Sequence, residues 1–94
     1  MIIGACRLHL HLPACSSLKA KRSRLKPLLA RLRREFNVAA SEVAWQDVWQ
    51  SADIAVVTVS NDAGHVQAQL DNVVAWIERN WPEIEVLEAS CELR

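Results

Sequence analysis

The segment from residue 17 to residue 34 carries side chains of the type that bind phosphate. It reads SLKAKRSRLKPLLARLRR and contains eight basic residues but no acidic one. Lys and Arg neutralise the phosphates of a nucleic acid and release its counterions, so such binding weakens steeply as salt is added. The candidate contacts with nucleic acid are Lys19, Lys21, Arg22, Arg24, Lys26, Arg31, Arg33 and Arg34.

The rest of the chain balances this charge, because the protein of 94 residues is formally neutral. Outside the segment lie only three of the 11 basic residues and all 11 acidic ones. Solvated surfaces usually mix both signs, so we expect one cationic surface that binds structured RNA or the ribosome. Two alternatives stay open. The segment either docks on an acidic protein partner, or is a solvated face that meets carboxylates of the same domain or a neighbouring subunit.

The histidines near the N-terminus raise the question of a metal site. His9 and His11 stand two apart in an alternating segment, so their rings project to the same side, and Cys15 follows nearby. A zinc or copper site also needs a third and a fourth ligand at fixed distances. Because no further residue points clearly there, we predict two surface or interface histidines and no metal site.

The segment PACSSLK, at residues 13–19, raises the question of catalysis. Ser16, Ser17, Lys19 and a helix N-terminus have the groups to hold a phosphate. The segment lacks a glycine and an internal arginine, and the chain shows no Ser-His-Asp or Cys-His arrangement. A phosphate-ester hydrolase is therefore the least favoured function. We predict a non-enzymatic protein with no catalytic residue, no cofactor and no small-molecule substrate.

Residue periodicity predicts which elements position these side chains. Residues 2–12 alternate between apolar and mixed positions, which predicts a strand with one apolar face. Ser16 or Ser17 offers an N-cap for the basic helix that follows. Within that helix Pro27 removes a backbone donor, so a kink or interruption is expected near residues 23–27. The apolar stripe of the helix comprises Leu18, Leu25, Leu28, Leu29, Leu32 and Phe36.

On this helix, one flank holds the residues expected to make the phosphate contacts, and the other basic residues are more peripheral. The flank consists of Lys19, Arg22, Lys26 and Arg33.

The second half of the chain follows a similar plan. Residues 37–46 read as a weaker strand, and the β-branched run 53–59 is apolar on both faces, as in a central strand covered on both sides. The sequence SND at residues 60–62 caps a second helix, which ends before Pro82. Residues 84–93 form the last strand.

The order β-α-β-β-α-β predicts an α+β fold in a single domain spanning residues 1–94. Right-handed crossovers place both helices on one face of a four-stranded antiparallel or mixed sheet. The simplest solution is the ferredoxin-like sandwich. In this arrangement we expect the first and third strands to lie in the middle and to pair in parallel, with the other two strands at the edges.

Several sequence blocks resemble the YlxP-like family of small bacterial proteins of unknown function. They are SLKAKR at the start of the first helix, FNV after it, QDVWQ between the second and third strands, and VSND before the second helix. The resemblance covers essentially the whole chain and implies a ferredoxin-like fold. It also implies a link to translation, because such proteins are often encoded near initiation and ribosome-maturation factors. It supplies no catalytic residues, and Pro27 departs from the family pattern.

The face of the sheet without helices has a different character. Ferredoxin-like RNA-binding proteins often stack bases on aromatic residues of this face, but here it offers Arg, His and aliphatic residues, so base stacking on it is not expected. An open aliphatic face usually meets another chain. We therefore predict a homo-oligomer, most simply a two-fold dimer, unless long side chains of the same sheet cover the patch. The interface candidates are His9, His11, Trp45, Trp49 and Val57.

Cysteine usage and hydropathy bear on the compartment. The three cysteines have no C-x-x-C spacing, which argues against a disulfide framework and a zinc ribbon. Cys6 and Cys91 lie on strands expected to be neighbours and are predicted to be reduced core residues, with Cys15 as the exposed thiol. No apolar segment approaches the roughly 18 residues of a membrane span, and the N-terminus does not read as a signal peptide. A cytoplasmic protein without membrane contact is expected.

Overall fold

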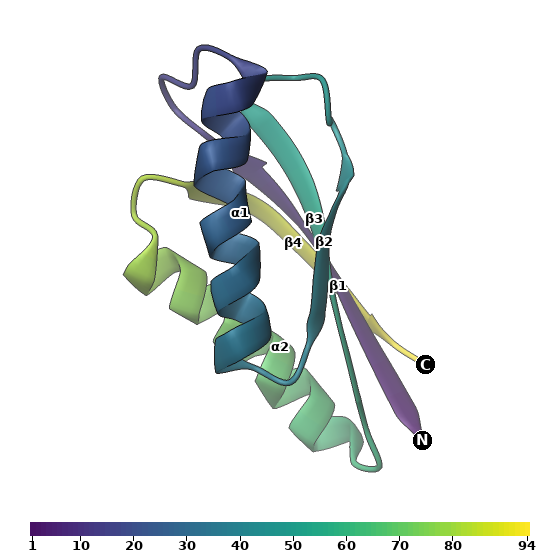
Figure 1. Cartoon of the computed structure of the whole chain (residues 1–94). Coiled ribbons are helices and arrows are strands. Elements are labelled where there is room, and N and C mark those ends of the chain that lie inside the picture. Colours follow the sequence, from purple (N-terminus) through teal and green to yellow (C-terminus); the bar gives the residue numbers. More distant parts are fainter.

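The computed structural model describes all 94 residues and shows four strands and two helices in the predicted order (Figure 1). The ferredoxin-like α+β arrangement is confirmed. The elements are β1 (Ile2–His11), α1 (Leu18–Glu35), β2 (Ala39–Ala44), β3 (Ser51–Ser60), α2 (Ala63–Asn80) and β4 (Glu85–Leu93).

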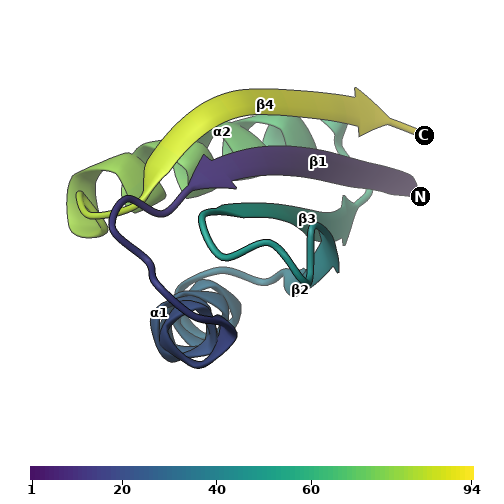
Figure 2. The same ribbon diagram turned by 90° about the horizontal axis from the view of Figure 1, so that it is seen from above.

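The sheet has the strand order β2-β3-β1-β4, so β1 and β3 lie in the middle as predicted. Figure 2 shows this order from above, with α1 seen end-on beside β2. The expectation that the middle strands pair in parallel is wrong, because every neighbouring pair is antiparallel. The reason is topological. The crossovers through α1 and α2 join β1 to β2 and β3 to β4, and the β2–β3 hairpin reverses the chain between them.

Helix α1 begins where the sequence predicts. The Ser17 hydroxyl accepts a hydrogen bond from the backbone N–H of Ala20 at 3.0 Å, which satisfies one of the free donors of the first turn. The predicted interruption at Pro27 is wrong, since the helix runs without a break from Leu18 to Glu35. Pro27 is exposed, so water can reach the carbonyl that loses its partner in the preceding turn.

The core lies between the sheet and the helices. From β1, residues Cys6, Leu8 and Leu10 are buried, which confirms the predicted alternation. The other face of the sheet is open, and there Val57 and Val59 are 36% and 52% exposed. The expectation that β3 is covered on both sides is therefore wrong within one chain, because both helices pack on the same face. The helices contribute Leu25, Leu28, Leu32, Val66, Leu70, Val73 and Ile77 to the core.

The cysteine predictions need correction. The register of β1 and β4 places Cys6 opposite Cys91, and their sulfur atoms form a disulfide bond, so these residues are not reduced thiols. Cys15 is the free cysteine, but it is fully buried rather than exposed. Its sulfur lies 3.7 Å from the carbonyl oxygen of Ser17, underneath the start of α1.

Neither helix is long and apolar enough to cross a membrane.

Candidate nucleic-acid interface

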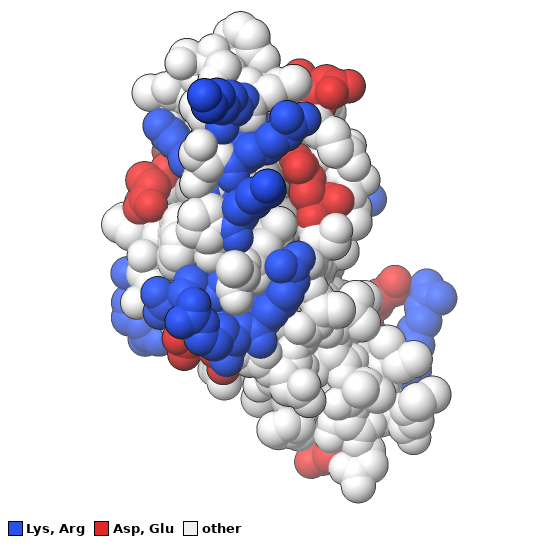
Figure 3. Space-filling view, viewed as in Figure 1, with Lys and Arg blue, Asp and Glu red and all other residues white.

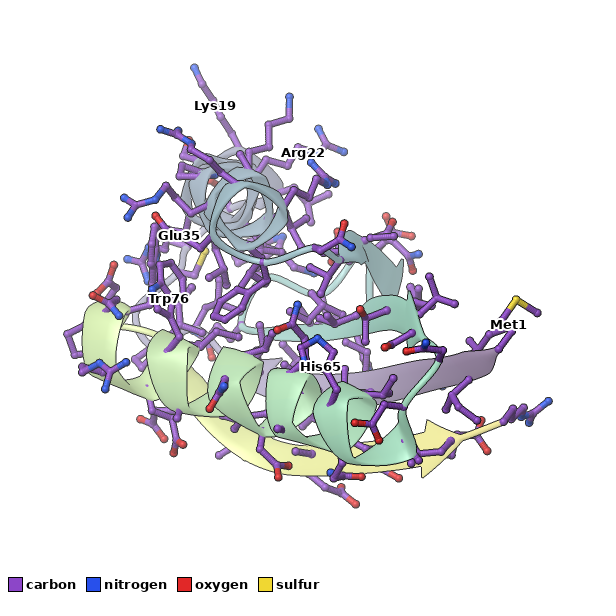
Figure 4. All side chains as sticks on the ribbon, turned by 90° about the horizontal axis from the view of Figure 1, so that it is seen from below. Met1, Lys19, Arg22, Glu35, His65 and Trp76 are labelled. Carbon is purple, nitrogen blue, oxygen red and sulfur yellow. A yellow bond between two sulfur atoms is a disulfide. The ribbon has the colours of Figure 1, made fainter.

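The basic residues of α1 form a cationic surface along the helix. In Figure 3 the blue side chains follow the length of α1 and are most crowded over its C-terminal end. Figure 4 shows Lys19 and Arg22 pointing away from the helix into solvent. We call the five exposed cations the α1 ridge; they are Lys19, Arg22, Lys26, Arg33 and Arg34.

The α1 ridge is not neutralised by carboxylates of the same chain. Of the eight basic residues of α1, only Lys21 and Arg31 form an ion pair. The acidic residues of the chain lie on other elements, apart from Glu35 at the end of the helix. The ridge therefore keeps its positive potential toward solvent, as a phosphate-binding surface requires.

Lys21 is a nucleic-acid candidate that the structure removes from the ridge. It is 1% exposed, and its Nζ lies 2.8 Å from a carboxylate oxygen of Glu42 on β2. The same ammonium donates to the backbone carbonyl of Trp45, whose φ of 65° is unusual for a residue other than glycine. Lys21 thus anchors α1 to the end of β2. Lys21 lies four residues before Leu25, so helical periodicity puts its side chain on the same side of α1 as the apolar stripe. This spacing is the sequence signal that could have revealed its burial.

Arg24 and Arg31 are half-buried on the flank of α1 opposite the ridge's Arg22. The guanidinium of Arg24 donates to the carbonyl oxygen of Pro13 at 2.8 Å. Arg31 pairs with Glu35 at 3.2 Å, and its guanidinium lies 5.6 Å from the ring centre of Trp76 on α2. Both are positioned by contacts within the protein, and their peripheral role in binding stays a prediction.

A groove of about 570 Å³ runs between α1 and β2, at the edge of the sheet. Its rim holds Arg22, Lys26 and Arg33, three of the four residues predicted to share one flank of the helix. Arg33 also donates to the carbonyl oxygen of Ala40 on β2 at 2.7 Å. The remaining lining residues are Leu25, Leu29, Ala30, Ser41 and Glu42.

The predicted interface residues lie on or beside the open face of the sheet. The strand register places His9, His11 and Val57 on that face, and the ring of Trp45 lies 5.9 Å from that of His9. Trp49 is 50% exposed in the connection between β2 and β3. The structure thus brings four of these residues onto or against one surface, and their role as an interface stays a prediction.

Asp53 is a site residue that the sequence analysis missed. Its side chain is only 9% exposed on the open face, where Arg7 Nε donates to it at 2.8 Å and Arg7 Nη2 forms an ion pair with it at 2.7 Å. His9 Nδ1 lies 2.5 Å from the other carboxylate oxygen. Burial acts to raise the pKa of Asp53, but the hydrogen bonds and charges of His9 and Arg7 outweigh it and hold the pKa below its ordinary value. Only the register of β1 against β3 reveals this cluster.

The cluster of Asp53, Arg7 and His9, called the Asp53 cluster, should make the stability of the fold depend on pH under acidic conditions. Because the folded pKa is lower than the unfolded value of 3.8, the ionised carboxylate stabilises the fold above that value, and this contribution is lost as pH falls through the folded pKa. We expect Asp53→Asn to cost about 1–2 kcal/mol at neutral pH, with the cost shrinking below about pH 4. Urea unfolding of both proteins at several pH values measures this, and a cost that stays constant down to about pH 2 would contradict it.

The residues considered for metal binding and catalysis do not converge. His9 binds Asp53, whereas His11 Nδ1 lies 3.1 Å from the carbonyl oxygen of Gln50. Cys15 is buried beneath α1. No cluster of three or more His, Cys, Asp or Glu side chains suited to a metal ion is present. The Ser17 hydroxyl, considered for phosphate binding, is used as the N-cap.

Comparison with known proteins agrees with the resemblance seen in the sequence blocks. The family model described as "Protein of unknown function (DUF503)" matches residues 3–91, which span all six elements. The chain is also similar to the protein called "Uncharacterized protein YlxP" of Bacillus subtilis (strain 168), with 41% identity over 69 residues. The aligned part is 73% of this chain and 74% of that protein.

Proposed function

The chain belongs to the family described as protein of unknown function DUF503, and we propose that it binds structured RNA, ribosomal RNA above all, through the α1 ridge. The observation that carries this proposal is that no carboxylate of the same chain neutralises the cations of the ridge. Five cations stand exposed on one helix, and none of them pairs with a carboxylate. A surface of this kind attracts a polyanion and is costly to keep without one, because like charges repel. The link to translation implied by the YlxP-like resemblance favours the ribosome as the source of the RNA.

The mode of binding follows from the groups on the ridge. Lys and Arg contact phosphates, which position a nucleic acid without reading its sequence. The open face of the sheet, where related folds stack bases, presents Arg7, His9 and aliphatic residues instead. We therefore assign a binding role with weak sequence preference and strong salt dependence, and no catalytic step.

A salt titration tests this function. The four residues of the predicted flank, Lys19, Arg22, Lys26 and Arg33, supply four phosphate contacts. The logarithm of the binding constant for ribosomal RNA should then fall with the logarithm of the salt concentration, with a slope of about −3. A triple variant with Arg22→Gln, Lys26→Gln and Arg33→Gln should bind about 100-fold more weakly at low salt, with a slope of about −1.

The matched control for this titration is Arg94→Gln, which removes a cation at the C-terminus, away from α1. It should bind as the unmodified protein does. Circular dichroism checks that the variants fold. Absence of RNA binding by the unmodified protein at low salt would remove the proposal.

A second candidate function is docking on an acidic protein segment, and the groove between α1 and β2 favours it. The groove combines an apolar floor, formed by Leu25, Leu29 and Ala30, with a basic rim. Apolar and acidic side chains of a partner would match these two parts. Ala30→Trp separates the candidates because it fills the groove without changing charge. RNA binding should survive this change, whereas docking of a protein segment in the groove should not.

We also propose that the open face of the sheet joins two copies of the chain. Ile3 lies opposite Val59 and Ala5 opposite Val57, so aliphatic side chains form a continuous patch across the two middle strands. A patch of one chemical kind is complementary to itself, as an isologous two-fold contact requires. Burial of this apolar patch would stabilise the dimer.

Sedimentation analysis tests the dimer. The unmodified protein should sediment as a dimer at micromolar concentration, and Val59→Lys should shift it to the monomer by placing a charge in the contact. Lys26→Glu, on the opposite side of the molecule, is the control and should leave the dimer intact. A monomeric unmodified protein at about 100 µM would exclude the interface, since such a contact would be weaker than most specific complexes.

A further inference from the structure

A cleft lies between the end of α1 and the C-terminal half of α2, and aromatic and polar side chains line it. Its volume is about 340 Å³. In Figure 4 the labelled Glu35 and Trp76 lie near each other between the two helices, Glu35 from α1 and Trp76 from α2. The lining residues are Glu35, Phe36, Asn72, Ala75, Trp76 and Arg79.

The aromatic wall of the cleft is held in place by its neighbours. The rings of Phe36 and Trp76 meet edge to face, with 6.0 Å between their centres. Trp81 packs against Trp76 at 5.7 Å, and Arg31 lies over the same ring. Trp76 is half-buried, so part of its surface remains open to the cleft. A ring fixed in this way does not have to be ordered when something binds, and the part that lines the cleft lies away from Arg31 and Trp81, which are not lining residues.

Polar groups surround the aromatic wall. The carboxylate of Glu35 accepts from Arg31 through one oxygen and keeps acceptor capacity on the other. The guanidinium of Arg79 donates hydrogen bonds, and the amide of Asn72 both donates and accepts. Arg79 is exposed and has no ion-pair partner. These are the groups that read the edges of nucleic-acid bases.

The cleft adjoins the C-terminal end of the α1 ridge, because its lining residues Glu35 and Phe36 directly follow Arg34 in the chain. Arg31, from the last two turns of α1, turns toward α2, whereas Arg33 and Arg34 are exposed to solvent. Figure 3 shows the densest group of blue side chains at this end of the helix. A nucleotide whose phosphate contacts Arg34, at this end of the ridge, therefore lies near the cleft.

We propose that this cleft receives one unpaired base of the RNA, which stacks on Trp76 while the adjacent phosphates contact the α1 ridge. The proposal rests on RNA binding as the function and narrows its substrate class. The preferred RNA contains a bulged or looped-out nucleotide beside a helix, because a base inside a duplex cannot reach the cleft. Stacking on an aromatic residue tolerates any base, so the preference concerns RNA structure more than sequence.

A pair of RNA hairpins tests the proposal. Both have a stem of about 12 base pairs, and one carries a single bulged adenosine. The unmodified protein should bind the bulged hairpin about tenfold more tightly, as expected when one base stacks on an aromatic side chain. Trp76→Leu should remove this preference by weakening binding of the bulged hairpin alone. The matched control is Trp49→Leu, in the β2–β3 connection, which should keep the preference.

Arg79→Gln gives a second test that does not disturb packing, since Arg79 is exposed. It should reduce the preference about threefold, because one hydrogen-bond donor is lost. Equal affinity of the unmodified protein for the two hairpins would overturn the inference while leaving RNA binding intact, and so would a preference that survives Trp76→Leu. Failure to bind either hairpin or ribosomal RNA at low salt would instead overturn the proposed function.

Discussion

Replacement of Lys21 by alanine should lower the free energy of unfolding by about 3 kcal/mol, far more than replacement of an exposed basic residue of the same helix. Lys21 is 1% exposed, and its ammonium forms an ion pair with Glu42. Loss of one partner of a buried pair leaves the other charge without compensation, which costs about 3–5 kcal/mol. The lower end applies here because the Glu42 side chain is 23% exposed and keeps some hydration. The backbone carbonyl of Trp45 also loses the hydrogen bond that it accepts from Lys21 Nζ.

Urea unfolding measures this effect. The matched control is Lys26→Ala, an exposed position on the same helix, where the change should stay within about 0.5 kcal/mol. The double variant Lys21→Met with Glu42→Leu should be more stable than Lys21→Ala, because removal of both charges leaves neither of them unpaired. Equal stability of Lys21→Ala and Lys26→Ala would show that the buried pair does not hold α1 against β2.

Gly4→Ala should be the second strongly destabilising change, at about 2 kcal/mol. Gly4 is buried on β1 and faces side chains of α2 and β4. A methyl group there would overlap Cγ1 of Val66, and it would lie 3.0 Å from Cδ1 of Leu70 and 3.3 Å from Cδ2 of Leu93. Side chains must move apart to admit it, and such overpacking costs about 1–3 kcal/mol.

The chain offers a control for this effect in its other glycine. A methyl group on Gly64, in the first turn of α2, would have Asp62 Oδ1 as its nearest neighbour at 3.6 Å, an ordinary contact. Gly64→Ala should therefore change stability by less than about 0.5 kcal/mol, or raise it slightly, since alanine favours the helix. If thermal unfolding shows the two alanine variants to be equally stable, the close approach of α2 to β1 is not a constraint.

Local sequence patterns determined the elements of this protein. The alternation of apolar residues in β1, the Ser17 cap of α1 and the stripe of α2 each depend on neighbours within a few residues, so they can be read without a fold. The order of these elements then left the ferredoxin-like sandwich as the simplest packing. The cationic character of α1 was equally visible, because charge and helical periodicity are both local properties.

Other features were decided only by the tertiary structure. The antiparallel pairing of β1 with β3 brings Asp53 beside His9, residues that are far apart in sequence. Lys21 is buried because β2 places Glu42 over its position on α1. The register of β1 and β4 joins Cys6 to Cys91.

The cleft at Trp76 also depends on tertiary structure, because it exists only where the end of α1 meets α2. Sequence alone therefore determined the basic side chains of the first helix and the element that carries them, but not the Asp53 cluster or the cleft. Contacts between distant segments decided which of these side chains remain free, because burial and pairing depend on register and on the close approach of elements.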